Sequence, residues 1–271
     1  MKLMIMTDIE GVAGILNFED WCVPEGRYYD KGQRLLTEEV NAAIDGFYEG
    51  GAGEITVIDG HGCGAIDPEL LDERVWLSRG DYEHIFPWGL DVSYDALAYV
   101  GQHAKAGTPY SQLTHTQGCS FLDMTLNDIS IGEYGQLVLC AMELGVPTIL
   151  ACGEQAFAEE AEALTPGVVT VSVKQGLLPD GLDHLDEDAY RSAKLSACHR
   201  SPKKARTMIR AGALESIQRL KTDPSSFQYP SLTPPYELNF ALRQTKDNAP
   251  RTERFEHPDS IIGAMNLPFA Q

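Results

Sequence analysis

The chain begins with a short apolar run that ends at an acid, Lys2-Leu3-Met4-Ile5-Met6-Thr7-Asp8. Such a run predicts a buried strand whose carboxyl end opens into a loop. Apolar residues then recur at helical spacing from about residue 33 to residue 49, where Gly50-Gly51 ends the pattern. The run Ile55-Thr56-Val57-Ile58 predicts a second buried strand. Strand, helix and strand in this order predict a right-handed βαβ unit and a mostly parallel sheet.

The same alternation continues along the chain. Further strands are predicted at residues 96–100, 148–151 and 168–173, and further helices at 133–144, at about 155–164 and from Ser201-Pro202 to about 220. Residues 121–131 predict a hairpin that turns at Asn127-Asp128. Four prolines between residues 224 and 235 mark a linker, and too few periodic residues follow Tyr236 to assign structure there.

These elements predict an α/β fold, with a mostly parallel doubly wound sheet and a smaller C-terminal segment or subdomain. A length of 271 residues suits one large domain with an appendage. We therefore expect an α/β catalytic domain over residues 1–222 and a linker with a small C-terminal segment over residues 223–271.

The composition excludes several classes of protein. The chain is 43% hydrophobic and 23% charged, which is typical of globular proteins. Its 21 Lys and Arg against 40 Asp and Glu give a formal charge of -19, which argues against a nucleic-acid or anionic-membrane surface. No apolar run is long enough for a transmembrane helix, and the first one is too short for a secretory signal. Six cysteines without CxxC spacing fit a reducing, cytoplasmic location.

Acids and histidines follow the predicted strands at the points where the strands end. Ligands of open α/β sheets bind outside the carboxyl ends of the strands, so these side chains are expected in one cleft. Two imidazoles and three carboxylates among them would repel each other or be poorly solvated in one cleft unless a cation lay between them, and such mixed nitrogen and oxygen donors suit Zn²⁺ or a similar divalent ion. The residues are Asp8 and Glu10, Asp59 and His61, His103, and Glu133 at a helix start, with His115 in a loop between.

Each of these residues alone has an ordinary structural interpretation, as a loop acid, a hydrogen-bonded loop histidine or a first-turn acid. A competing motif also follows the second strand, because Gly60-His61-Gly62-Cys63-Gly64-Ala65 fits the dinucleotide fingerprint G-x-G-x-x-A. Pro68 stands where the phosphate-binding helix should be in its early turns, and Asp59 would face the pyrophosphate. We therefore reject dinucleotide binding.

Several short motifs, taken together and in order over roughly residues 1 to 220, resemble the bacterial D-aminopeptidase family, binuclear zinc peptidases named for a dipeptide-transport operon. The opening segment carries the first of them, Thr7-Asp8-Ile9-Glu10-Gly11-Val12-Ala13-Gly14. The others are Leu36-Thr37-Glu38-Glu39-Val40-Asn41, Asp59-Gly60-His61, Val100-Gly101-Gln102-His103-Ala104, Thr114-His115-Thr116, Gly132-Glu133 and Val173-Lys174-Gln175.

The resemblance implies two Zn²⁺ ions per chain, with Asp8 bridging them and Glu10, His61, His103 and Glu133 completing their shells. It also implies that His115 is the catalytic residue and that the chain forms a homodecamer whose active sites face an enclosed space. A small peptide or amide is then the expected substrate, with a preference for D-amino acids that follows from the resemblance alone.

The mechanism we expect is hydrolysis of the amide next to a free amino terminus, with a metal-bridging hydroxide as nucleophile and His115 as proton shuttle or oxyanion stabiliser. A nucleophilic His115, as attributed within the family, would leave the two ions largely redundant. Two alternatives remain: an amidase for another small amide, and a non-catalytic metal- or solute-binding module.

Overall fold

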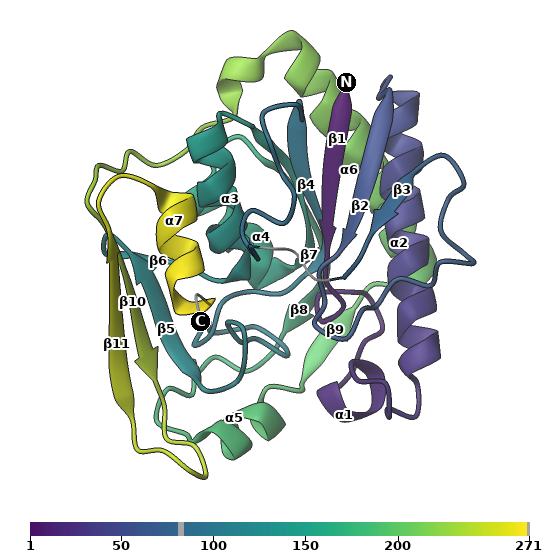
Figure 1. Ribbon diagram of the computed structural model, residues 1–271. Coiled ribbons are helices and arrows are strands. Elements are labelled where there is room, and N and C mark those ends of the chain that lie inside the picture. The colour runs from purple at the N-terminus through teal and green to yellow at the C-terminus, as the bar shows by residue number, and fades with distance from the viewer. Residues whose placement is uncertain (81–83, 270–271) are drawn as a thin grey trace.

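A computed structural model describes residues 1–80 and 84–269 of the chain. Its main feature is a seven-stranded sheet in the order β3-β2-β1-β4-β7-β8-β9 (Figure 1). All neighbouring strands are parallel except β9, which runs antiparallel to β8. The strands are β1 (Lys2–Thr7), β2 (Glu54–Asp59), β3 (Trp76–Ser78), β4 (Ala96–Gln102), β7 (Thr148–Glu154), β8 (Val169–Gly176) and β9 (Ala197–His199).

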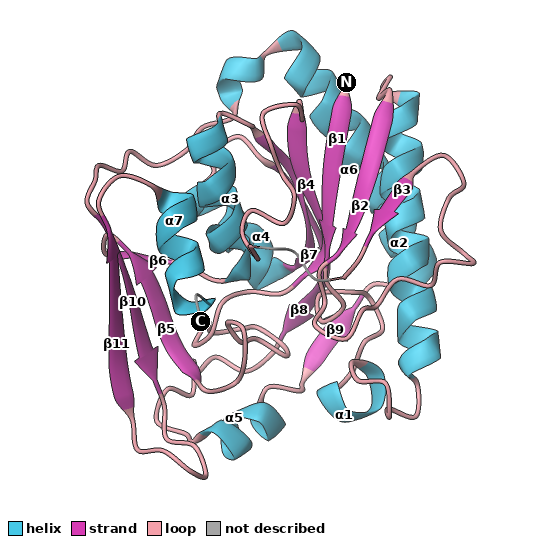
Figure 2. Cartoon of the chain, viewed as in Figure 1, coloured by secondary structure: helices cyan, strands magenta, loops and turns pink. Residues whose placement is uncertain are grey.

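Helices cover both faces of this sheet and create two hydrophobic cores (Figure 2). Successive β1 side chains point to opposite faces, so Leu3 and Ile5 pack with α2 and α6, whereas Met4 and Met6 pack with α3 and α4. The four helices are α2 (Tyr29–Glu49), α3 (Glu133–Leu144), α4 (Gln155–Leu164) and α6 (Pro202–Thr222). Shorter helices are α1 (Phe18–Trp21), α5 (Glu187–Ala193) and α7 (Ile261–Asn266), with 3-10 turns at Pro224–Ser226 and Leu267–Phe269.

A second, antiparallel sheet has the strand order β11-β10-β5-β6. Its strands are β5 (Phe121–Leu126), β6 (Ile129–Ser130), β10 (Tyr236–Leu242) and β11 (Arg251–His257). Asn127 and Asp128 both have positive φ, as a two-residue hairpin turn requires. The C-terminal segment therefore pairs with a hairpin from the middle of the chain. The division at residue 222 stays a prediction, and residues 270–271 of that segment lie outside the described part.

The structure confirms the predicted fold class and the predicted order of the main strands and helices. Helix α2 begins at Tyr29, earlier than predicted. Its first turn carries few apolar residues, so the apolar pattern does not reveal it. The short elements α1, β3, α5 and β9 were not predicted. They contain three to seven residues each, too few to show a period.

The strand order changes direction between β1 and β4, since the chain runs from β1 outward to β2 and β3 and returns on the other side of β1. Ligands of such sheets bind at this switch point. Here the loop after β1 packs against the end of β4, and the Gly11 amide donates to the Gly101 carbonyl at 2.7 Å. Gly101 has a φ of +83°, and a Cβ on it would lie 2.0 Å from the Asp8 carbonyl oxygen. Glycine thus allows the two segments that carry the predicted ligands to meet.

Among the described residues, no helix is long and apolar enough to cross a membrane.

Candidate metal centre and active site

The polar residues predicted to gather at the strand ends do converge there. Asp8 follows β1, His61 follows β2, His103 follows β4, and Glu133 is the first residue of α3. A cleft of about 770 Å³ opens above them, and Asp8, Glu10, His61, His115 and Glu133 line it. All six predicted site residues therefore belong to one cluster.

Asp8 occupies the centre of this cluster. Its Oδ1 lies 3.2 Å from His61 Nδ1, and its Oδ2 lies 3.2 Å from His103 Nε2. The main-chain amide of Ile9 donates to Oδ1 at 2.8 Å, which holds the carboxylate in place. The two oxygens of one buried carboxylate thus face two different imidazoles.

His61 and Glu10 complete one side of the centre. His61 Nε2 lies 2.7 Å from the Cys22 carbonyl, which can only accept a hydrogen bond, so this nitrogen carries the proton. The other nitrogen, Nδ1, faces Asp8 and lies 3.4 Å from Glu10 Oε2. A neutral His61 therefore directs an unprotonated nitrogen at two carboxylates.

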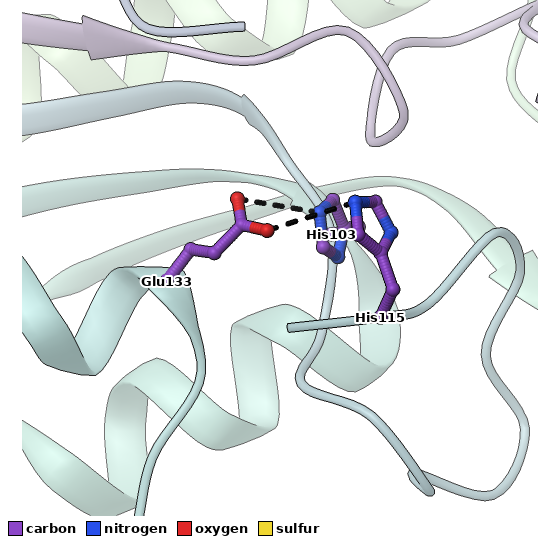
Figure 3. A group of neighbouring side chains, drawn as sticks. All are labelled: His103, His115 and Glu133. Atoms are coloured by element: carbon purple, nitrogen blue, oxygen red, sulfur yellow. Dashed lines mark ion pairs between the residues drawn. The ribbon is translucent and has the colours of Figure 1, made fainter. Parts of the chain in front are cut away.

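His103, His115 and Glu133 form the other side (Figure 3). His103 Nδ1 donates to the Ala104 carbonyl at 2.8 Å, and His115 Nδ1 donates to the Leu113 carbonyl at 3.0 Å. Their Nε2 atoms each lie 3.6 Å from a different oxygen of Glu133. The two rings stack with centroids 4.1 Å apart, so Glu133 joins two oriented imidazoles.

The electrostatic field in the cluster favours positive charge. Burial by itself would lower the pKa of His61 and of His103, but the acids outweigh it: Glu10 and Asp8 at His61, and Glu133 and Asp8 at His103. Both pKa values are therefore raised well above the ordinary value. Burial by itself would raise the pKa of Asp8, yet the imidazoles of His103 and His61, which face its two oxygens, bring it well below the ordinary value. Without a metal ion, protons on the imidazoles neutralise the carboxylates.

The unsatisfied atoms fit a divalent cation better than protons. Glu10 Oε2 and His103 Nε2 are buried and have no hydrogen-bond partner among the described residues. Two sets of three residues could each hold a cation, because the ligand atoms within a set all lie within 4.8 Å of one another. One set is Asp8, Glu10 and His103, and the other is His103, His115 and Glu133. Carboxylate oxygens and imidazole nitrogens are ordinary zinc ligands, and each imidazole is oriented by a carbonyl, as metal-bound histidines usually are.

Three supporting residues, Gln102, Lys174 and Glu154, had no role in the sequence-based prediction. Gln102 Nε2 donates to Asp8 Oδ2 at 2.9 Å and lies 3.5 Å from Glu133 Oε2, so it links the two sides of the centre. The buried Lys174 Nζ donates to the Glu10 carbonyl and, at 2.8 Å, to Gln112 Oε1. Gln102 and Lys174 stand inside the quoted family motifs, which was the only signal for them.

Glu154, the last residue of β7, fixes the histidine loop. Its two oxygens accept hydrogen bonds from the amides of Ala104 at 2.9 Å and Gln112 at 2.7 Å. These amides lie one residue after His103 and three residues before His115. One buried carboxylate therefore positions the backbone that carries both imidazoles, and no local sequence pattern indicates this.

Asp59, which follows β2, has a structural role. Its carboxylate accepts hydrogen bonds from the amides of Ala65 and Ile66 and pairs with the guanidinium of Arg79. The glycine-rich loop thus wraps around Asp59, and no helix follows it within residues 60–75. This arrangement agrees with the rejection of dinucleotide binding.

Carboxylates and imidazoles that converge in a cleft at the switch point of a parallel sheet mark this chain as an α/β protein with a candidate divalent-metal centre. The chain belongs to the D-aminopeptidase family, whose sequence model matches residues 1–257. It is similar to a D-aminopeptidase of Bacillus subtilis, with 33% identity over 178 residues. That match covers 65% of this chain and 64% of the relative, which is less than two thirds of the relative's length.

The fold also matches a solved structure, the Zn-dependent D-aminopeptidase DppA from Bacillus subtilis, described as a self-compartmentalizing protease. The TM-score is 0.84 with 23% sequence identity, and the match covers 99% of this chain and 96% of the other. The two proteins share their fold over nearly their whole lengths.

Proposed function

We propose that this chain is a zinc-dependent aminopeptidase that hydrolyses the amide bond after a free N-terminal residue, with D-amino acid peptides or amides as substrates. In this proposal Asp8, Glu10, His61, His103 and Glu133 hold two zinc ions, and His115 is the catalytic residue. Membership of the D-aminopeptidase family, together with the similarity in sequence and in fold to D-aminopeptidase from Bacillus subtilis, supports the reaction class.

The observation that carries the proposal is the position of Asp8. Its two oxygens face His61 and His103 at equal distances of 3.2 Å, with Glu10 beside the first imidazole and Glu133 beside the second. A single carboxylate between two such donor sets is what a shared ligand of two cations requires. The five residues supply enough donors for two ions when water fills the remaining positions.

Zinc bound there would supply Lewis acidity, which activates water near neutral pH and polarises the substrate carbonyl. The protein residues then have separate tasks. Because the Leu113 carbonyl holds the proton of His115 on Nδ1, Nε2 is free to accept a proton and to pass it on. The His103 ring on one side and the Phe18 ring, 5.4 Å away, on another fix the plane of this imidazole.

Recognition of the free amine agrees with the charge of the chain. A chain of formal charge -19 attracts an ammonium group at long range. Two bound zinc ions would offset the three carboxylates at the cleft floor, so a further carboxylate or carbonyl near the ions must hold the amine. An N-acetylated substrate lacks that charge and adds bulk at the end of the substrate that must be enclosed. We therefore expect it to be a poor substrate.

The proposal is tested with zinc-loaded protein and three compounds: a D-alanyl amide, its L enantiomer and its N-acetyl derivative. We expect hydrolysis of the D compound, loss of activity on chelation and recovery on adding zinc, with little hydrolysis of the acetylated compound. Equal rates for the acetylated and free compounds would exclude an aminopeptidase and favour the amidase alternative. A zinc-loaded protein that hydrolyses none of a panel of small amides would favour the non-catalytic binding module.

The proposal extends to assembly and location. We expect a homo-oligomer, with a homodecamer as the specific form, and the self-compartmentalizing description of the structural relative supports this. All six cysteines are unpaired in the structure, which supports work in the reducing cytoplasm. Light scattering of the purified protein tests the subunit number, and a monomer would contradict it.

A further inference from the structure

The cleft contains a cationic side chain that the proposed metal centre does not use. Among the described residues that line the cleft, the arginines are Arg79 and Arg191, and no lysine is present. Arg79 is engaged by the fold, because its Nε and Nη2 contact the buried Asp59 carboxylate and Nη2 also donates to the Ile66 carbonyl. Arg191, on α5, is the cation left to meet a ligand.

Arg191 keeps most of its hydrogen-bonding capacity. Its Nε contacts Glu19 Oε1 at 3.1 Å, and its Nη1 and Nη2 have no hydrogen-bond partner among the described residues. The Arg191 side chain is 42% exposed and that of Glu19 is 59% exposed. Ion pairs this exposed contribute little free energy, so Glu19 holds Arg191 weakly. The terminal nitrogens are available for a carboxylate, which matches the guanidinium fork in geometry and charge.

Arg191 and His115 both contact the ring of Phe18. Its Cζ lies 5.1 Å from the centroid of the Phe18 ring, and the His115 ring contacts the same Phe18 at 5.4 Å, edge to face. An extended peptide advances by about 3.3–3.6 Å per residue. A terminal carboxylate one or two residues beyond the bond cleaved at His115 therefore comes within reach of the guanidinium.

A carboxylate needs such a partner in this protein. The chain carries a formal charge of -19, and bound zinc offsets it only at the carboxylates of the proposed centre. This field opposes the approach of an anionic group that lies away from the metal ions. A local cation with two free nitrogens offsets that repulsion at one place, and it selects a substrate whose negative end falls at that place.

We propose that Arg191 binds the terminal carboxylate of a short peptide substrate, and that this contact sets a preference for a free acid over an amide at that end. The inference rests on the proposed aminopeptidase function and adds a residue that distinguishes its substrates. It assigns Arg191 to substrate recognition on the leaving-group side, with no part in holding metal.

The test compares two substrates that share the scissile bond and differ only in the terminal charge, D-alanyl-D-alanine and D-alanyl-D-alanine amide. With the zinc-loaded full chain, kcat/KM should be about tenfold or more higher for the free acid. Arg191→Gln should lower kcat/KM for the acid by about tenfold or more and change that for the amide by less than about twofold. Arg191→Lys should restore part of the preference, because it keeps the charge and loses the fork.

Arg251→Gln is the matched control. Arg251 also pairs through Nε with one exposed glutamate, Glu253, at 2.8 Å, but it lies on β11 and does not line the cleft. Its replacement changes the net charge equally and should leave the ratio of the two kcat/KM values unchanged.

The outcomes separate this inference from the proposed function. If the wild type cleaves the amide as well as the acid, or if Arg191→Gln lowers both equally, the role of Arg191 is wrong while the aminopeptidase assignment stands. If Arg251→Gln removes the preference as strongly as Arg191→Gln, the effect is one of net charge and the inference also fails. If the wild type cleaves neither compound, the proposed function itself fails.

Discussion

Replacing Glu39 with glutamine should stabilise the folded chain, increasingly so as the pH rises. Glu39 lies on α2 and is 1% exposed. Its Oε1 accepts a hydrogen bond from the Ala13 amide at 3.1 Å, and Oε2 has no partner among the described residues. Burial raises the pKa of this carboxyl from 4.5 to about 8, against the smaller opposing effects of the Ala13 amide and Lys174.

The size of the effect follows from proton linkage. Between about pH 4.5 and pH 8 the folded chain holds a proton on Glu39 that the unfolded chain has released. The free energy of unfolding therefore falls by about 1.4 kcal/mol for each pH unit in this range. At pH 7 this destabilisation amounts to about 3 kcal/mol, whereas at pH 5 it is below about 1 kcal/mol. Glutamine has the shape of the protonated acid and does not titrate, so Glu39→Gln should raise the free energy of unfolding by these amounts.

Urea unfolding of both proteins at matched zinc content, from pH 5 to pH 8, measures the difference. Glu49→Gln is the control, because Glu49 lies at the exposed end of the same helix and pairs there with Arg210. Its effect should be small and nearly independent of pH. A difference between wild type and Glu39→Gln that stays constant across this range would refute the argument that Glu39 is buried as the neutral acid.

The other predictions concern the metal centre and its support. His115→Ala should retain zinc in elemental analysis, and its kcat should fall by about 100-fold or more. Loss of zinc would show that His115 is a ligand, and a near wild-type kcat would show that it is not a catalytic residue. Gln102→Leu should weaken zinc binding by about 10- to 100-fold in a chelator competition, because Asp8 and Glu133 lose their shared amide; an unchanged affinity would contradict that role. Gly101→Ala should destabilise the fold by at least about 1 kcal/mol, because Gly101 has a positive φ and an added Cβ would meet the Asp8 carbonyl. Gly62→Ala should not destabilise it, because nothing lies within 4 Å of the added Cβ, and equal Tm values for the two variants would contradict this explanation.

The sequence sufficed for those parts of the fold that depend on local patterns. Buried strands show as apolar runs, and the carboxyl ends of parallel strands meet at one edge, so Asp8, His61 and His103 could be predicted to converge. Strands β10 and β11 could not be predicted in this way. Strand β11 carries mostly charged residues with exposed side chains, and β10 pairs with β5, which lies over a hundred residues earlier. Such pairings depend on tertiary contacts that no local window contains.

The site shows the same limit. The resemblance to a family indicated His115, but its position depends on Glu154, which binds the backbone of its loop from the end of another strand. Gln102 points at Asp8 because the loop after β1 packs against the end of β4, where Gly11 contacts Gly101. Roles of this kind arise from long-range contacts, so residue type and spacing alone do not reveal them.

The central claim is that one carboxylate, Asp8, is shared by two zinc ions that are both needed for peptide hydrolysis. The most direct measurement is a titration of metal-free protein with zinc, in which bound zinc per chain and the rate of hydrolysis of a D-alanyl peptide are followed together. The account predicts two ions per chain, with activity rising until the second equivalent is bound. Full activity with a single bound ion, or in the absence of zinc, would contradict it.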